Sequence, residues 1–319
     1  MPQLTFRDVH QDAALTNLSV GWMQNNANFV HNKVFPVITV PHKSDVYYKY
    51  NRGDFFRDTF TKVADGDITS GGGFGLSTDT YLTEEWGRHM IITDQARANS
   101  DPAIDLDRDA AQMLTQQGMI RRENLWAGEF FTTSVWGTDA AGSSVGYWDD
   151  ASTEIFDHVE TARSTILSNT GMEMNCVVIG YEVYVALKNH PLIVDRYKHT
   201  SSSSISLDMI ARVLDIPKLM VAKSVYNSAA EGATESTGFS LGKNALFMHV
   251  ADSPGLMKPS AGYTFVWNGL AGNGVEGLSV NRYDLRSQMR PADAIEVRME
   301  FDFKVVAPEL GYFYSGIVQ

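Results

Sequence analysis

The clearest hydrophobic pattern in the chain lies close to its C-terminal end. From Ile295 to Val305, apolar side chains alternate strictly with five charged ones. A period of two is typical of a strand with one buried face, and the run is about twice the usual strand length. A register slip of one residue would carry all the charges into the core. The pattern therefore predicts one long, half-buried strand.

Apolar residues at helical spacing predict a very long helix from about residue 102 to 130. Asp101 and Pro102 fit an N-cap followed by proline at the first helical position. Carboxylates that complement the helix dipole crowd the first turns at Asp105, Asp107 and Asp109. At 1.5 Å per residue the helix would be roughly 40 Å long, so it needs packing along its whole length.

Between these two features, shorter runs predict a compact unit of alternating elements. Helices are expected at about 152–168, 181–189 and 207–214, and strands at 176–179, 219–226, 245–250, 263–267 and 278–283. Pro191 and Pro217 are expected to stop the second and third helices. These elements indicate a compact unit of the α/β or the α+β class.

The N-terminal part of the chain has a different texture. Residues 1–35 are rich in amides and poor in charge, which predicts an extended arm that ends in β geometry at residues 34–41. Residues 42–90 carry many aromatic side chains around the turn signal Asp65-Gly66, so they predict a long two-stranded hairpin. Such a hairpin is marginal in water, and its aromatics need a surface on the same chain or on a neighbouring subunit.

Composition narrows the function. The chain has 319 residues, with 38 acidic against 26 basic side chains, and a net charge of −12 argues against a general nucleic-acid binder. The sequence shows neither an 18-residue apolar run nor a signal peptide, so no membrane partner is expected. The single cysteine, Cys176, lies in an apolar run and predicts a buried thiol in a protein that matures in a reducing cytoplasm.

Three motifs suggest chemistry that their surroundings do not support. Residues 272–277 spell the dinucleotide fingerprint, but the residues that follow alternate like a strand, where the fingerprint requires a helix. Residues 142–146 match a nucleophile elbow but are expected to lie in a small-residue loop. The aspartates at 105, 107 and 109 begin like a calcium loop, yet they are better explained as a helix start. No catalytic, cofactor-binding or metal-binding residue is predicted, and no cofactor.

Several stretches, taken in order, carry a family resemblance. They are Val40–Asp45 with Tyr47–Tyr50, Arg52–Asp58, Gly71–Phe74 with Leu76–Tyr81, Asp94-Gln95, Arg97–Asn99, Asp105–Ala110, Arg121–Glu123, Val178–Gly180, Leu187–Pro191 and Glu309–Phe313. On these stretches the chain resembles the major capsid proteins of tailed bacteriophages, which have the Hong Kong 97-type fold. The resemblance covers nearly the whole chain.

The resemblance implies an α+β fold with four parts. Residues 1–41 would be the N-terminal arm, 42–99 the extended β-hairpin loop, 100–172 with 291–319 the peripheral domain with its spine helix and long strands, and 173–290 the compact axial domain. Hexamers and pentamers would close into an icosahedral head around double-stranded DNA. The hairpin would then bury its aromatics on a neighbouring subunit, and the expected inter-subunit contacts are Tyr47, Tyr48, Phe55, Phe56, Phe60 and Phe74.

The same resemblance implies the partners and the location. The protein would assemble with copies of itself in the host-cell cytoplasm and become part of the virion. Portal and decoration proteins are further expected partners. The similarity begins too close to the N-terminus for a large fused scaffolding segment, so assembly would need either a separate scaffold or none. Packaged DNA would be held without sequence-specific contact. A covalent cross-link is not predicted.

Two alternatives to a phage shell subunit remain open on the sequence. The first is a shell protein of an encapsulin-like cellular nanocompartment, which would have the same fold. The second is an α+β enzyme of unknown activity, which would need a concave site with convergent polar groups.

Overall fold

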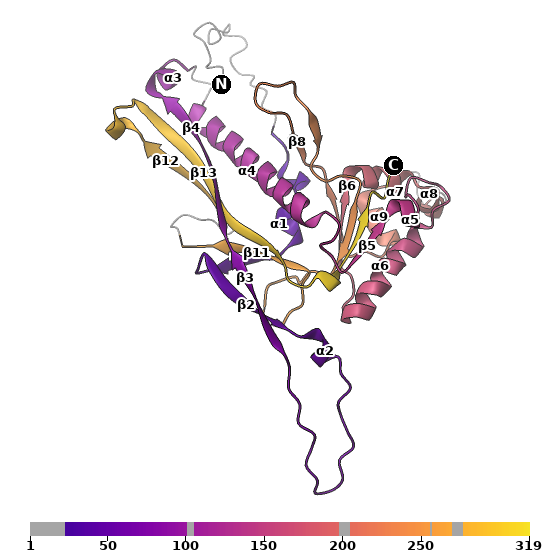
Figure 1. The fold of residues 1–319 in the computed structure, drawn as a ribbon. Coiled ribbons are helices and arrows are strands. Elements are labelled where there is room, and N and C mark those ends of the chain that lie inside the picture. The colour runs from indigo at the N-terminus through magenta and orange to yellow at the C-terminus, as the bar shows by residue number, and fades with distance from the viewer. Residues whose placement is uncertain (1–22, 101–104, 198–204, 256, 270–276) are drawn as a thin grey trace.

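Two five-stranded sheets joined by one long helix dominate the fold (Figure 1). The computed structural model describes residues 23–100, 105–197, 205–255, 257–269 and 277–319. Within them, one sheet and the long helix form an elongated part, and the second sheet with its helices forms a rounder part beside it. A loop reaches far from both.

The elongated sheet is built around the strand predicted from alternation. That strand, β13 (Ala292–Val305), runs antiparallel to β4 along one edge and to β11 and then β12 along the other, and β1 lies parallel to β11. The partner strands are β1 (Val37–Val40), β4 (Glu84–Thr93), β11 (Gly262–Trp267) and β12 (Leu278–Asp284). The predicted strand is thus confirmed. Its charged face is less exposed than expected because side chains pair there: Arg298 bonds Glu296 and Glu85 at 2.7 and 2.8 Å.

The long helix α4 (Leu106–Phe130) packs along the apolar face of β13. Its 25 residues make it about 37 Å long. The Asp105 side chain caps it by accepting from the Arg108 backbone N–H at 3.2 Å, and two aspartates follow in the first turn as predicted. Near the middle, Gly118 allows close approach, since a Cβ there would lie 3.1 Å from the Met299 sulfur. The expected cap at residues 101–102 lies outside the described residues.

The second sheet has the strand order β5-β14-β10-β6-β7. Its strands are β5 (Thr138–Ala141), β14 (Gly311–Ser315), β10 (Ala245–Met248), β6 (Cys176–Gly180) and β7 (Lys218–Ala222), and the helices beside it are α5 (Gly142–Val145), α6 (Ile155–Thr170), α7 (Tyr181–Asn189), α8 (Pro191–Tyr197) and α9 (Leu207–Val213). Gly171 ends α6 in the left-handed conformation that glycine adopts most readily. Cys176 is buried and free, and burial raises the pKa of its thiol to about 12.

Two features in this region differ from the sequence predictions. The strand expected at 219–226 is two strands, β7 and β8 (Val225–Asn227), and β8 pairs instead with β9 (Thr237–Phe239). The chain leaves the second sheet at Lys223, whose N–H donates to the Asn28 carbonyl at 3.1 Å. Pro191 ends α7 but also begins α8, which the sequence analysis missed although proline suits a first helical turn.

The arm prediction is also corrected where the structure describes it. Four apolar side chains of this segment, Phe29, Val30, Val34 and Phe35, belong to the core, and α1 (His31–Val34) follows the single turn η1 (Asn26–Asn28). The β geometry expected before Pro41 is confirmed by β1. Residues 1–22 lie outside the described part of the chain.

The predicted long hairpin is only partly right. β2 (Ser44–Tyr50) pairs with β3 (Leu76–Leu82) over seven residues, and β4 then leaves to join β13. The chain between β2 and β3 consists of the single turn α2 (Arg52–Phe55) and an irregular stretch from residue 56 to 75. The extended loop in Figure 1 is this segment. The remaining short elements are α3 (Asp94–Ala98), η2 (Arg286–Gln288) and η3 (Pro308–Leu310).

The two sheets cross the boundaries expected for the peripheral and axial domains. β11 and β12 lie within residues 173–290 but pair in the elongated sheet with β13. Conversely, β14 and β5 lie outside that range but complete the sheet that contains β6 and β10. If the two domains are defined by their sheets, β11 and β12 therefore belong with β13, and β5 and β14 belong with β6 and β10.

Candidate assembly surface

The base of the extended loop is fixed to its own chain. The Tyr47 ring lies 5.7 Å from the Phe265 ring, and Tyr81 stacks on the same ring at 4.6 Å. The Tyr47 hydroxyl donates to Asp79 at 3.1 Å, and burial together with that carboxylate raises the pKa of Tyr47. Tyr47, expected to contact a neighbour, is therefore half-buried in its own subunit.

A small aromatic cluster closes the loop above this base. The Tyr50 ring lies 5.9 Å from Phe55 and 5.6 Å from Phe74. Two backbone links brace the same point: the Asn51 N–H donates to the Gly75 carbonyl at 3.0 Å, and the Gly75 N–H donates to the Asp54 side chain at 2.8 Å. Phe55 and Phe74 nevertheless keep more than half of their surface in solvent.

Two large apolar side chains beyond this cluster are almost fully exposed. Phe60 is 99% exposed and Ile68 is 90% exposed, and both lie in the irregular part of the loop. Tyr48 and Phe56, two more of the predicted contacts, are about two-thirds exposed. Full burial of one such side chain is worth about 1.5–3 kcal/mol, so a loop of this composition gains stability when another surface covers it. Ile68 was not among the predicted contacts, although the same loop carries it.

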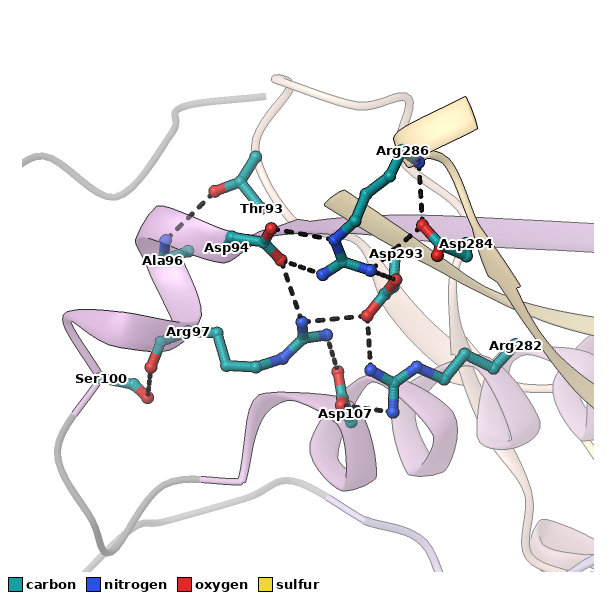
Figure 2. Close-up of polar contacts among 10 residues, drawn as sticks. All are labelled: Thr93, Asp94, Ala96, Arg97, Ser100, Asp107, Arg282, Asp284, Arg286 and Asp293. Carbon is teal, nitrogen blue, oxygen red and sulfur yellow. Dashed lines mark hydrogen bonds and ion pairs between the residues drawn. The ribbon is translucent and has the colours of Figure 1, made fainter. Parts of the chain in front are cut away.

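A second feature, at the far end of the elongated sheet, is a cluster of arginines and aspartates (Figure 2). At its centre the Asp293 side chain is only 2% exposed and bonds three guanidinium groups, from Arg97 at 3.0 Å, Arg286 at 2.9 Å and Arg282. Arg97 also reaches Asp107 in the first turn of α4 at 2.7 Å. The cluster thus ties α3, α4, β12 and β13 together.

The electrostatics of this cluster favour ionised Asp293. Its hydrogen bond from Arg282 is the main cause that lowers the pKa of the carboxyl, and Arg286 and Arg97 act in the same direction. Sequence analysis missed the cluster because its members come from segments nearly two hundred residues apart. Each carboxylate of the cluster accepts from arginines of the same cluster, so the arrangement is that of a structural clasp.

Within the described residues, the motifs that suggested chemistry do not form a catalytic site. The segment 142–146 is not the loop expected, since β5 precedes it and α5 contains its serines. The neighbouring His158 is already engaged, because its Nδ1 accepts from the Trp148 indole at 2.9 Å. Residues 272–276 lie outside the described chain, but Gly277 leads into a strand, as predicted. The described residues hold no metal-binding group of three or more His, Cys, Asp or Glu side chains.

Two hollows of about 280 and 250 Å³ are found among the described residues. The first, beside α7, is lined by Trp148, Glu182 and His190, among others. Both His190 ring nitrogens bond the backbone, at Asp150 and Leu192, so this histidine is not a base poised for substrate. The second lies between Met23–Phe29 and α4 and is lined mainly by amide and apolar side chains.

Sequence comparison relates the chain to phage proteins. No family model matches it. It is 22% identical over 315 residues to the major capsid protein of Pseudomonas phage JBD67, covering 96% of this chain and 97% of that protein. It is 23% identical over 237 residues to the major capsid protein of Burkholderia phage BcepMu, covering 71% and 73% of the two chains.

Structural comparison gives the fold. A phage-related protein from Bordetella bronchiseptica matches with a TM-score of 0.69 at 20% identity, over 92% of this chain and 94% of that one. The mature capsid of bacteriophage PhiM1 matches with a TM-score of 0.58 at 12% identity, over 97% and 92%. The chain has the Hong Kong 97-type capsid fold. The α+β fold class and the resemblance to tailed-phage capsid proteins are both confirmed.

The fold is shared with a second kind of shell. An encapsulin complex from Synechococcus elongatus also matches, with a TM-score of 0.58 at 12% identity over 97% of this chain and 96% of that one. Among the described helices, none combines the length and apolar character that a membrane crossing requires.

Proposed function

We propose that the protein is the major capsid protein of a tailed phage and that its role is structural. The observation that carries the proposal is its similarity to a phage major capsid protein over almost the whole length of both chains. A shell subunit works by contact with its own copies, so the functional surface is an interface and not a catalytic pocket.

The extended loop is the surface through which copies would join. Its tip carries Phe60 and Ile68 almost completely exposed, and its base is fixed to the body at Tyr47. A rigid base with an uncovered apolar tip suits insertion onto a neighbouring subunit, in a head-to-tail contact that closes into rings. Tyr48, Phe55, Phe56 and Phe74 would extend the same contact, with Tyr47 supporting it from within its own chain.

The finer features of the proposal follow from the capsid role. The rings are hexamers and pentamers that close into an icosahedral head around double-stranded DNA. The net charge of −12 disfavours tight adhesion of packaged DNA, which fits contact without sequence specificity. Portal and decoration proteins and a separate scaffold complete the head, and assembly takes place in the host-cell cytoplasm. The arm, loop, peripheral and axial divisions describe the subunit within that shell.

An encapsulin-like nanocompartment is the second candidate, because an encapsulin shares the fold over nearly the full chain. Sequence similarity favours a phage capsid protein over an encapsulin, since both curated relatives are phage capsid proteins. The neighbouring genes separate the two candidates: portal and terminase genes are expected beside a phage capsid gene, and a cargo-enzyme gene beside an encapsulin gene.

The experiment that tests assembly compares three forms of the full-length protein by light scattering and negative-stain microscopy. Wild type is expected to give closed shells or rings of five and six. The double variant Phe60→Ser/Ile68→Ser is expected to remain as smaller species, because it removes the apolar tip. The matched control Phe60→Leu/Ile68→Val keeps an apolar tip and should assemble. Shells of normal yield from the serine variant would contradict the proposed role of the loop.

A further inference from the structure

The segment from Gln24 to Val34 joins parts of the molecule that are distant in sequence. At one end the Gln24 N–H donates to the Gln116 side chain on α4 at 3.1 Å, while the Gln24 side chain accepts from the Val225 N–H at 3.0 Å. At the other end the Lys33 carbonyl accepts from Lys218 at 2.6 Å. The segment therefore spans between the long helix and the β7–β8 connection.

One buried carboxylate holds the centre of this segment. Glu123, on α4, is fully buried and accepts from the backbone N–H groups of Val30 and His31 at 3.1 and 2.9 Å. Its other partners are the His31 ring at 2.7 Å and the Ser224 hydroxyl at 3.2 Å. Since a carboxylate can only accept, the His31 Nδ1 carries the proton in this contact. Glu123 therefore links α1, α4 and the β7–β8 connection.

The contact also replaces a missing helix cap. Val30, the residue that precedes α1, supplies no side-chain cap of its own. The Glu123 carboxylate instead accepts from the N–H groups at the start of α1, where a negative charge is favourable. Without it, several buried donors would lose their partner at once, and unmade bonds of this kind are costly.

We propose that Glu123 is a latch: one carboxylate on which the attachment of the segment 24–34 to α4 and to the β7–β8 connection depends, so that its loss loosens this segment while the sheets stay folded. The segment also contributes Val30 and Val34 to the same hydrophobic core as residues of β10 and β13, so the polar contacts at Glu123 act together with apolar packing. The latch fixes the position of residues 24–34 on the body of the subunit. It is a property of the folded subunit and does not rest on the proposed function.

The test is hydrogen exchange on the full-length protein with Glu123→Gln. Glutamine is nearly the same size, but in either orientation its NH₂ group faces a donor from which the Glu123 carboxylate accepts a hydrogen bond. Backbone amides of residues 30–34 should exchange roughly a hundredfold faster or more, while amides of β10 and β13 keep wild-type protection. Glu129→Gln, an exposed position on the same helix, should leave every segment unchanged.

Either of two results would overturn the latch. Unchanged protection of residues 30–34 in Glu123→Gln would mean that the carboxylate does not hold the segment. Equal loss of protection across both sheets would make Glu123 an ordinary stability residue. If that variant yields no folded protein, His31→Phe, which keeps a ring and removes one donor, is measured with the same criteria. Because exchange reports on the subunit, failure of the latch is distinguishable from failure of shell formation.

Discussion

Truncation of Phe301 probes the packing on which the elongated part depends. The side chain lies in the middle of β13 and is only 3% exposed. Its ring centre is 5.0 Å from that of Phe303, and the Arg122 guanidinium of α4 lies 4.7 Å above it. The substitution Phe301→Ala therefore removes contacts both along the strand and between the sheet and the long helix.

The expected loss of stability is large. Phe-to-Ala changes in a tight core cost about 3–5 kcal/mol, through lost transfer free energy and the cavity that remains. The stacked Arg122 adds a cation–π contribution of about 0.5–2 kcal/mol, which places the site in the upper part of that range. Since domains are stable by only about 5–15 kcal/mol, this one substitution removes a substantial fraction.

The assay is urea unfolding of the full-length protein followed by tryptophan fluorescence. Trp126, fully buried on α4, is one of six tryptophans in the chain, and its surroundings change when the core unfolds. Phe301→Ala should lower the midpoint with little change in the slope against denaturant. The matched control is Phe60→Ala, whose side chain is 99% exposed, and its change should stay within about 0.5 kcal/mol.

Two outcomes would refute this reasoning. An unchanged midpoint for Phe301→Ala would mean that the face between α4 and β13 is not a tight core. A loss of similar size in Phe60→Ala would mean that the loop tip already contributes to the stability of the isolated subunit.

Three further predictions follow from the loop, the ionic cluster and the cysteine. Replacing residues 57–73 with a glycine-serine linker of equal length should leave the unfolding midpoint unchanged but abolish shells; intact shells would contradict it. Asp293→Asn should lower the thermal midpoint at neutral pH. The folded-state pKa of Asp293 lies below its ordinary value of 3.8, so the extra stability of wild type over Asp293→Asn is fully present above pH 3.8 and is lost as the pH falls through the folded-state pKa. A stability difference that persists in stronger acid, with both proteins folded, would count against the ion-pair explanation. Cys176, with a thiol pKa raised to about 12, should resist a thiol reagent in the folded protein and react after denaturation; rapid native labelling would show that it is accessible.

The elements that sequence predicted best are those with a strong local pattern. β13 was visible because its apolar and charged residues alternate, and α4 because its acidic first turn and helical spacing agree. The hairpin was misjudged because strand pairing is not local: β4 follows β3 directly but takes β13, two hundred residues away, as its partner. The split of 219–226 depended on the contact between Lys223 and Asn28, which no local pattern reveals.

The candidate assembly surface was likewise predictable only in part. Aromatic content marked the loop, but it did not distinguish side chains that fold back from those that stay exposed. Tyr47 finds Phe265 in its own chain, whereas Phe60 meets nothing there, and the two look alike in sequence. The clasp around Asp293 and the latch at Glu123 combine residues from distant segments, so only the fold brings them into view.

The most direct test of the central claim is a cryo-electron microscopy reconstruction of the assembled particle at side-chain resolution. The account predicts a closed shell in which Phe60 and Ile68 are buried against a neighbouring copy while Tyr47 stays packed on Phe265 of its own chain. A closed shell in which both tip residues remain in solvent, or fold back onto their own subunit, would contradict it.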